Sequence, residues 1–147
     1  MAHYAKLSED NEVLTVLTLA DKDEQNEAGE TVESLGQAYL EKHNNWPAHL
    51  WKKCSYNTIN GEHLLGGTPF RGTYPAKGFI WDSENEMFKP KKPYASWVFN
   101  SSSHNWEPPI ESPETTTTID GREIPDFYEW DEINQTWIKG PTDYPSL

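Results

Sequence analysis

The hydrophobic and polar positions in the second half of the chain repeat one phrase three times. In each copy a large aromatic residue is followed directly by Asp or Asn, and a second large aromatic residue stands seven positions after the first. A proline lies close behind each copy, at Pro90, Pro108 and Pro141. The three aromatic pairs are Trp81 and Phe88, Phe99 and Trp106, and Trp130 and Trp137. Aromatic residues favour a pleated surface and short polar runs favour turns, so the phrase predicts three β-hairpins.

This spacing has a physical reason. A loop of four or five residues brings the two aromatic rings near each other across the hairpin, and such pairs contribute roughly 0.2–1 kcal/mol each. The Asp or Asn that opens the loop can accept a hydrogen bond from the backbone two residues further on. The closing proline cannot donate to a strand ladder and therefore ends the second strand or lies on an edge. An isolated hairpin is marginally stable in water, so the three hairpins are expected to lean on each other or on a partner.

The first half of the chain predicts another hairpin and one strand rich in aliphatic residues. Residues 2–20 contain two strands around a polar turn at residues 8–11. Residues 13–19 are the most apolar stretch in the protein, with apolar side chains on both faces of a strand, which predicts a central strand. A further strand is expected at residues 52–56.

One amphipathic helix is predicted at residues 31–43. Val32, Leu35 and Tyr39 follow the helical spacing, Thr31 is a suitable N-cap, and Pro47 stands shortly after the end. One helix among many strands predicts a mostly β (α+β) protein: an antiparallel sheet with one short helix, three aromatic-clamped β-hairpins and extended Pro/Thr-rich segments. The copies of the phrase are unevenly spaced, which argues against a propeller or a solenoid.

Turn signals between these elements are specific. Asn60-Gly61 is the strongest two-residue hairpin turn in the sequence, and Asp120-Gly121 is a second one. Gly66-Gly67 lacks the Lys and Ser/Thr of a phosphate-binding loop, so it predicts a tight turn. Arg71 lies between aromatic residues and is expected to pair with a carboxylate or to stack on a ring.

The distribution of proline and threonine predicts three parts. Residues 1–109 form the main β-rich domain with its helix, and residues 110–126 form a Pro/Thr-rich linker. Residues 127–147 form a tethered hairpin followed by an extended arm.

Composition and charge reduce the number of function classes that fit this chain. Hydrophobic residues make up 35% of the 147 residues, and the mean hydropathy of −0.85 leaves little material for a core, although there are seven Trp and seven Tyr. The net charge of −12, with no large Lys/Arg cluster, argues against binding to nucleic acid. The N-terminus has no signal-peptide pattern and no apolar run is long enough to span a bilayer, so we expect a soluble protein made in a cytoplasm.

We find no pattern of residues for catalysis, a cofactor or a metal. The five histidines are scattered, and no serine lies in a Gly-x-Ser-x-Gly turn. The only cysteine, Cys54, is expected to be a small buried residue. The acidic stretch at residues 21–29 lacks the Gly and the final Glu of a calcium loop, so we expect a solvated loop. These observations favour a protein that is not an enzyme.

Aromatic rings are the main candidates for interaction. Their expected use is to clamp hairpins and fill a thin core, with any ring left exposed forming a protein interface. Stacking on sugars is the alternative for exposed Trp and Tyr. The interface candidates are Trp81, Phe88, Phe99, Trp106, Trp130, Trp137 and Arg71.

Several segments together resemble a known group of proteins: residues 1–7, 33–36, 55–58, 66–71, 78–82 and 93–97. As a set they are similar to small proteins encoded by tailed phages of marine bacteria, including cyanophages. The similarity runs from the start to about Pro109, and the last hairpin resembles a repeat of the same phrase. Singly, the motifs are weak.

This resemblance implies a virion structural component that assembles in the cytoplasm of the host bacterium. The expected partners are other virion proteins, with several copies per particle and no nucleic acid or membrane. A capsid decoration (cement) protein would bind the major capsid protein, whereas a tail or fibre adaptor, or a carbohydrate-binding receptor module, would join the tail or fibre proteins.

Overall fold

A computed structural model describes residues 1–141 of the chain, which is mostly β with antiparallel strand pairs and one α-helix, as predicted. The chain divides into two compact units, each described by itself below. The first unit is Met1–Lys91 with Asn100–Asn105, and the second is Lys92–Phe99 with Trp106–Leu147. The end of the predicted main domain at residue 109 therefore falls inside the second unit. Most of the predicted C-terminal arm lies outside the described residues.

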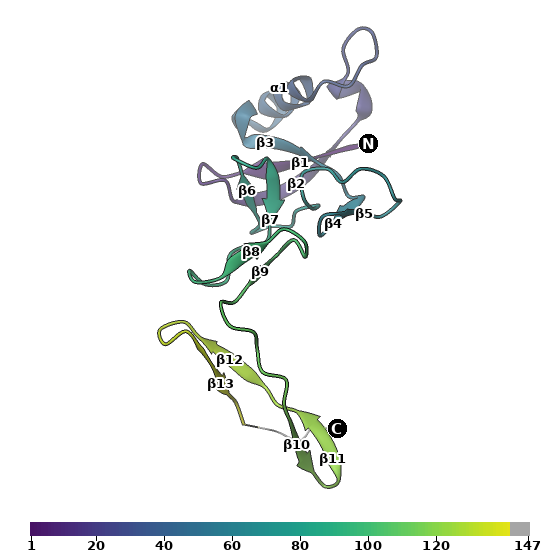
Figure 1. Ribbon diagram of the computed structural model, residues 1–147. Helices are drawn as coiled ribbons and strands as arrows, with labels where there is room; N and C mark the ends of the chain where they lie inside the picture. Colours follow the sequence, from purple (N-terminus) through teal and green to yellow (C-terminus); the bar gives the residue numbers. More distant parts are fainter. Residues whose placement is uncertain (142–147) are drawn as a thin grey trace. The chain divides into compact units, whose positions relative to one another are not determined.

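The first unit is built on a three-stranded antiparallel sheet in the order β2-β1-β3 (Figure 1). These strands are β1 (Ala2–Leu7), β2 (Val13–Leu19) and β3 (Trp51–Cys54). The prediction that residues 13–19 form the central strand is wrong, because β3 pairs with β1 and leaves β2 at an edge. Only the two ends of β2, Val13 and Leu19, are buried, since the strand is covered there and open between them.

Helix α1 (Glu33–Asn44) packs on one face of this sheet, with Leu40 against Tyr4 and Trp51. Two details of the predicted helix are wrong: Val32 and not Thr31 precedes the first turn, without a side-chain cap, and Leu35 is exposed. The reason is Gly36, which lies so close to the sheet that an added Cβ would stand 2.3 Å from the Tyr4 hydroxyl. This close approach turns the Gly36 and Leu40 side of the helix inward. The left-handed Asn45, at φ 51°, ends the helix.

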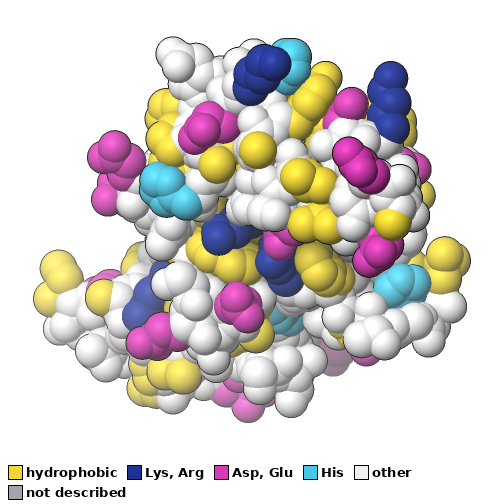
Figure 2. Space-filling view, turned by 90° about the horizontal axis from the view of Figure 1, so that it is seen from above, with side chains coloured by type: hydrophobic (Ala, Val, Ile, Leu, Met, Phe, Trp, Pro, Cys, Tyr) yellow, Lys and Arg dark blue, Asp and Glu magenta, His cyan; other side chains and the backbone are white. Residues whose placement is uncertain are grey.

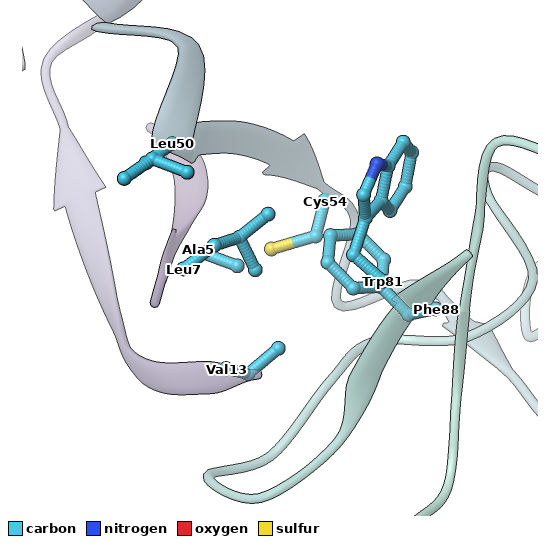
Figure 3. Close-up of a cluster of buried hydrophobic side chains, with 7 residues drawn as sticks. All are labelled: Ala5, Leu7, Val13, Leu50, Cys54, Trp81 and Phe88. Atoms are coloured by element: carbon cyan, nitrogen blue, oxygen red, sulfur yellow. The ribbon is translucent and has the colours of Figure 1, made fainter. Parts of the chain in front are cut away.

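The first aromatic hairpin packs on the opposite face of the sheet. It consists of β6 (Ile80–Asp82) and β7 (Met87–Lys89), and its backbone bonds to the β1–β2 turn through the Trp81 N–H and the Asn11 carbonyl. Figure 3 shows the side chains that fill this layer, with Cys54 beside the hairpin rings. The buried cluster is Ala5, Leu7, Val13, Leu50, Cys54, Trp81 and Phe88. Even and odd positions of β1 thus serve two different cores, as the two-residue period of a strand requires.

All three predicted aromatic-clamped hairpins are confirmed. The others are β8 (Val98–Asn100) with β9 (Asn105–Glu107), and β12 (Tyr128–Asp131) with β13 (Thr136–Lys139). In the first and third copies the aromatic residues are direct cross-strand partners. The ring centroids are 4.8 Å apart for Trp81 and Phe88, 5.3 Å for Phe99 and Trp106, and 5.2 Å for Trp130 and Trp137.

The turns of the three hairpins share one hydrogen-bond pattern. The residue after the first aromatic accepts hydrogen bonds from the backbone N–H groups two and three residues further on, and these acceptors are Asp82, Asn100 and Asp131. The last loop residue takes a left-handed backbone, at Glu86, His104 and Gln135. Side-chain to backbone bonding within the loop therefore sets the same turn three times, as the sequence predicted.

Short elements complete the two units. The 3₁₀ helices η1 (Asp21–Glu24) and η2 (Ala48–Leu50) flank α1 in the chain. Strands β4 (Thr58–Ile59) and β5 (Glu62–His63) join through Asn60-Gly61, and β10 (Thr116–Ile119) and β11 (Arg122–Pro125) join through Asp120-Gly121. All four turn residues have positive φ, which confirms both predicted turns. The predicted Pro/Thr linker thus contains a hairpin of its own.

Candidate interaction site

The structure divides the aromatic interface candidates into two groups. Trp81 and Phe88 are buried in the first unit, and Trp130 is buried in the second. In the isolated chain these three rings are core residues. The other three rings are only partly buried and offer some surface to a partner: Phe99, Trp106 and Trp137.

Arg71 is held inside the first unit. Its guanidinium donates to both carboxylate oxygens of Glu33, at 2.5 and 2.7 Å, and to the carbonyl of Lys53 at 3.0 Å. The same group lies 4.9 Å from the ring centre of Phe70 and 5.3 Å from that of Trp81. Both expected contacts, a carboxylate and a ring, are therefore present. Arg71 joins α1, β3 and β6, and this contact set is that of a structural residue.

Burial alone would raise the pKa of Glu33, but its hydrogen bonds outweigh that effect. The Arg71 side chain and the Lys53 N–H donate to the carboxylate, and they hold its pKa below the usual range. The ionised carboxylate is thus the form that the fold stabilises.

A second ion pair lies where the sequence predicted only a solvated loop. Glu24 is 3% exposed and accepts hydrogen bonds from the Tyr4 hydroxyl at 2.8 Å and from Lys53 Nζ at 2.8 and 3.0 Å. The solvated-loop prediction is wrong for this residue, because Lys53 and Tyr4 supply partners that a buried carboxylate needs. Burial, together with the bond to Glu24, raises the pKa of Tyr4. No local pattern in the sequence indicates these partners, which stand far away in the chain.

The second unit has little core of its own. Among its described residues, Trp130 is the one large side chain that is buried. The same unit leaves six large apolar side chains exposed: Tyr94, Val98, Ile110, Phe127, Ile133 and Ile138. Its rings instead cluster around Trp97, whose centroid lies 6.2 Å from that of Trp130 and 6.4 Å from that of Trp137.

A groove of about 500 Å³ lies within the second unit, and we call it the Trp97/Trp137 groove. Its lining combines two indoles, two carboxylates, one proline and one hydroxyl: Trp97, Trp137, Glu107, Glu111, Pro108 and Ser112. The indole N–H of Trp137 donates to the Ile110 carbonyl at 2.7 Å, which fixes this ring. The sequence patterns did not predict this groove, although Trp97 is the one Trp after residue 80 that belongs to none of the spaced pairs.

The indole N–H of Trp97 stands out among the polar groups of the described chain. It is the one buried side-chain nitrogen or oxygen in residues 1–141 without a hydrogen-bond partner. A buried donor left without an acceptor costs about 1–3 kcal/mol. Trp97 therefore carries an unused donor, and this nitrogen is buried below the surface of the groove that the ring lines.

The electrostatics of this unit favour positive ligands. Residues 92–99 and 106–141 contain nine Asp and Glu but only three Lys and Arg, which is a net charge of −6 within a total of −12. An excess of negative charge of this kind attracts cations and repels polyanions.

Figure 2 shows one face of the chain as a whole. Acidic side chains are spread widely on it, and the Lys and Arg side chains form no continuous basic area.

The described part of the chain contains no group of three or more His, Cys, Asp or Glu side chains arranged to hold a metal ion. None of the helices within residues 1–141 has the length and apolar character needed to cross a membrane. Comparison of the chain with protein-family models, curated proteins and solved structures finds no match.

Proposed function

We propose that this chain is a non-catalytic structural protein of a phage virion, and specifically a capsid decoration protein that binds the shell. The observation that carries the proposal is the second unit, which exposes six large apolar side chains and buries one. The resemblance of residues 1–109 to small proteins of marine tailed phages supplies the virion context.

The architecture of the second unit supports a docking role. Two of its hairpins, β10–β11 and β12–β13, are separate two-stranded sheets. Such sheets are marginally stable alone and have backbone edges to which a partner strand can add. Exposed side chains such as Phe127 and Ile138 would be covered in the same contact. A larger lattice would thus supply the burial that the unit lacks.

A tail or fibre adaptor is the alternative within the virion, and the same surface would serve it. The two roles differ in copy number. The carbohydrate-binding version of this alternative has less support, because Trp81, Phe88 and Trp130 are buried and have no open face for a sugar ring.

The test is quantification of the protein in washed, intact particles by mass spectrometry with isotope-labelled peptides. A copy number comparable with that of the major shell protein supports decoration, and a small fraction of that number supports a tail position. Absence from the particles overturns the virion role.

A matched pair of variants tests the docking surface. Phe127→Ser removes an exposed apolar side chain of the second unit, and Leu65→Ser removes one from the first unit. We expect the first change to reduce incorporation into particles and the second to leave it unchanged. Equal incorporation of both variants would argue against this surface.

A further inference from the structure

The Trp97/Trp137 groove has the size and the chemistry of a binding site. Its volume of about 500 Å³ falls inside the range of roughly 300–1,000 Å³ that ligand sites occupy. The Trp97 and Trp137 rings are inclined by 59° to each other, so they do not stack face to face. The ring of Trp137 is also anchored through its N–H, which gives the groove one preformed wall.

Three features of the lining define the complementary ligand. Indole faces attract a cation, and Trp is the strongest such partner among the aromatic residues. The carboxylates of Glu107 and Glu111 add negative charge at the same place. Pro108 adds an apolar surface to the same lining.

A basic peptide satisfies all three features at once. Its Arg or Lys side chain supplies the cation, and its extended chain can lie along Pro108 and the rings. A small inorganic cation has no apolar part to cover Pro108 and the rings, and a neutral sugar brings no charge to the two carboxylates. The net charge of −6 on the described part of this unit also steers a basic partner towards it.

We propose that the Trp97/Trp137 groove binds an extended basic segment of a partner protein, with an Arg or Lys side chain against the indoles and the carboxylates of Glu107 and Glu111. This inference deepens the proposed docking role and rests on it for the identity of the partner as another virion protein.

The experiment uses the full chain with ¹⁵N-labelled tryptophan. The probes are a short peptide of alternating Pro and Arg, the same peptide with neutral citrulline in place of Arg, and a β-1,4-linked glucose oligomer. Indole N–H resonances are followed by NMR, and that of Trp97 is assigned with Trp97→Phe. We expect the Arg peptide to shift the Trp97 resonance, because the peptide lies against this ring. Because charge contributes, the citrulline peptide is expected to bind about five-fold more weakly.

Two substitutions with the same change in charge serve as variant and control. Glu111 lines the groove, whereas Glu114 is an exposed residue of the same unit outside it. We expect Glu111→Gln to weaken binding of the Arg peptide by about three-fold or more, and Glu114→Gln to leave it unchanged. Both variants should keep the spectrum of the folded protein, because neither side chain belongs to a core.

Three outcomes would overturn the inference, and a fourth would overturn only the virion role. Equal affinity for the Arg and citrulline peptides would show that the positive charge of the peptide does not contribute to binding. Equal weakening by the Glu111 and Glu114 substitutions would show attraction by net charge alone. Binding of the glucose oligomer in place of the peptide would make the groove a sugar site. Absence of the chain from particles, with peptide binding intact, would refute the virion role and leave the groove assignment standing.

Discussion

Removal of the Arg71 guanidinium tests whether this residue is structural or belongs to an interface. Arg71 makes a two-bond contact with Glu33, and Glu33 accepts a third bond from the Lys53 N–H at 2.7 Å. Loss of one partner from a buried ion pair costs about 3–5 kcal/mol. The two side chains are 19% and 28% exposed, so solvent screens part of this interaction. We therefore expect Arg71→Ala to destabilise the first unit by about 2–3 kcal/mol.

The conservative variant Arg71→Lys separates the effect of charge from that of the guanidinium geometry. Arg71→Lys keeps the positive charge but loses the planar fork that reaches both oxygens of Glu33, as well as the bond to the Lys53 carbonyl. We expect it to cost about 1–2 kcal/mol, roughly half of the alanine effect. Arg122→Ala is the matched control, because Arg122 is the only other arginine of the chain and is exposed. It should leave stability within about 0.5 kcal/mol of the native value.

The assay has to report on the first unit separately, because two units need not unfold together. Residue-resolved hydrogen exchange of the Tyr4 and Trp51 amides does so, since both lie in the sheet that Arg71 supports through Glu33 and Lys53. A loss of protection in Arg71→Ala no larger than in Arg122→Ala would refute the structural role. Arg71 would then have to be assigned to a partner contact.

Three further predictions concern the cores. Phe88→Ala should lower the free energy of unfolding in urea by about 3–5 kcal/mol, because Phe88 is fully buried. Trp106→Ala should lower it by less, because the Trp106 ring is half-buried. Equal losses in the two variants would contradict this ranking. Burial raises the pKa of the Cys54 thiol from 9.0 to about 12, so the native protein should resist alkylation. The free energy of unfolding should fall by about 1.4 kcal/mol per pH unit between these two values, because the unfolded thiol loses its proton first. Rapid alkylation of the native protein would contradict this prediction. The lowered pKa of Glu33 means that its ionised carboxylate stabilises the fold fully above about pH 4.5, and progressively less as acid protonates it. The urea midpoint should therefore fall on acidification. The fall should be less steep in Glu33→Gln, which has no carboxylate to protonate at this position.

Local rules in the sequence predicted the hairpins well. The seven-residue spacing of Trp81 and Phe88 and the Asp82 turn depend only on residues close in the chain, and the structure places them as expected. The Asn60-Gly61 turn is local in the same sense.

Features that depend on distant residues could not be predicted from local patterns. The position of β2 at an edge follows from the pairing of β3 with β1, across more than forty residues of chain. The burial of Glu24 follows from Lys53, and the inward turn of Gly36 follows from the Tyr4 ring. The Trp97/Trp137 groove joins segments from both sides of the second hairpin loop, so only the unpaired position of Trp97 could have indicated it.

The three copies of the hairpin phrase show how one local design leads to different amounts of burial. Their turns and ring pairs are alike, which makes each hairpin a repeated unit set by its own sequence. The first copy gains a sheet on which to pack, and Trp81 and Phe88 are buried there. In the third copy Trp130 is buried, while Trp137 keeps a face on a groove and Ile138 is exposed. Because a hairpin needs further burial for stability, the open faces of this copy are the place where a partner would add most. That imbalance favours a protein completed by its neighbours over one that works alone.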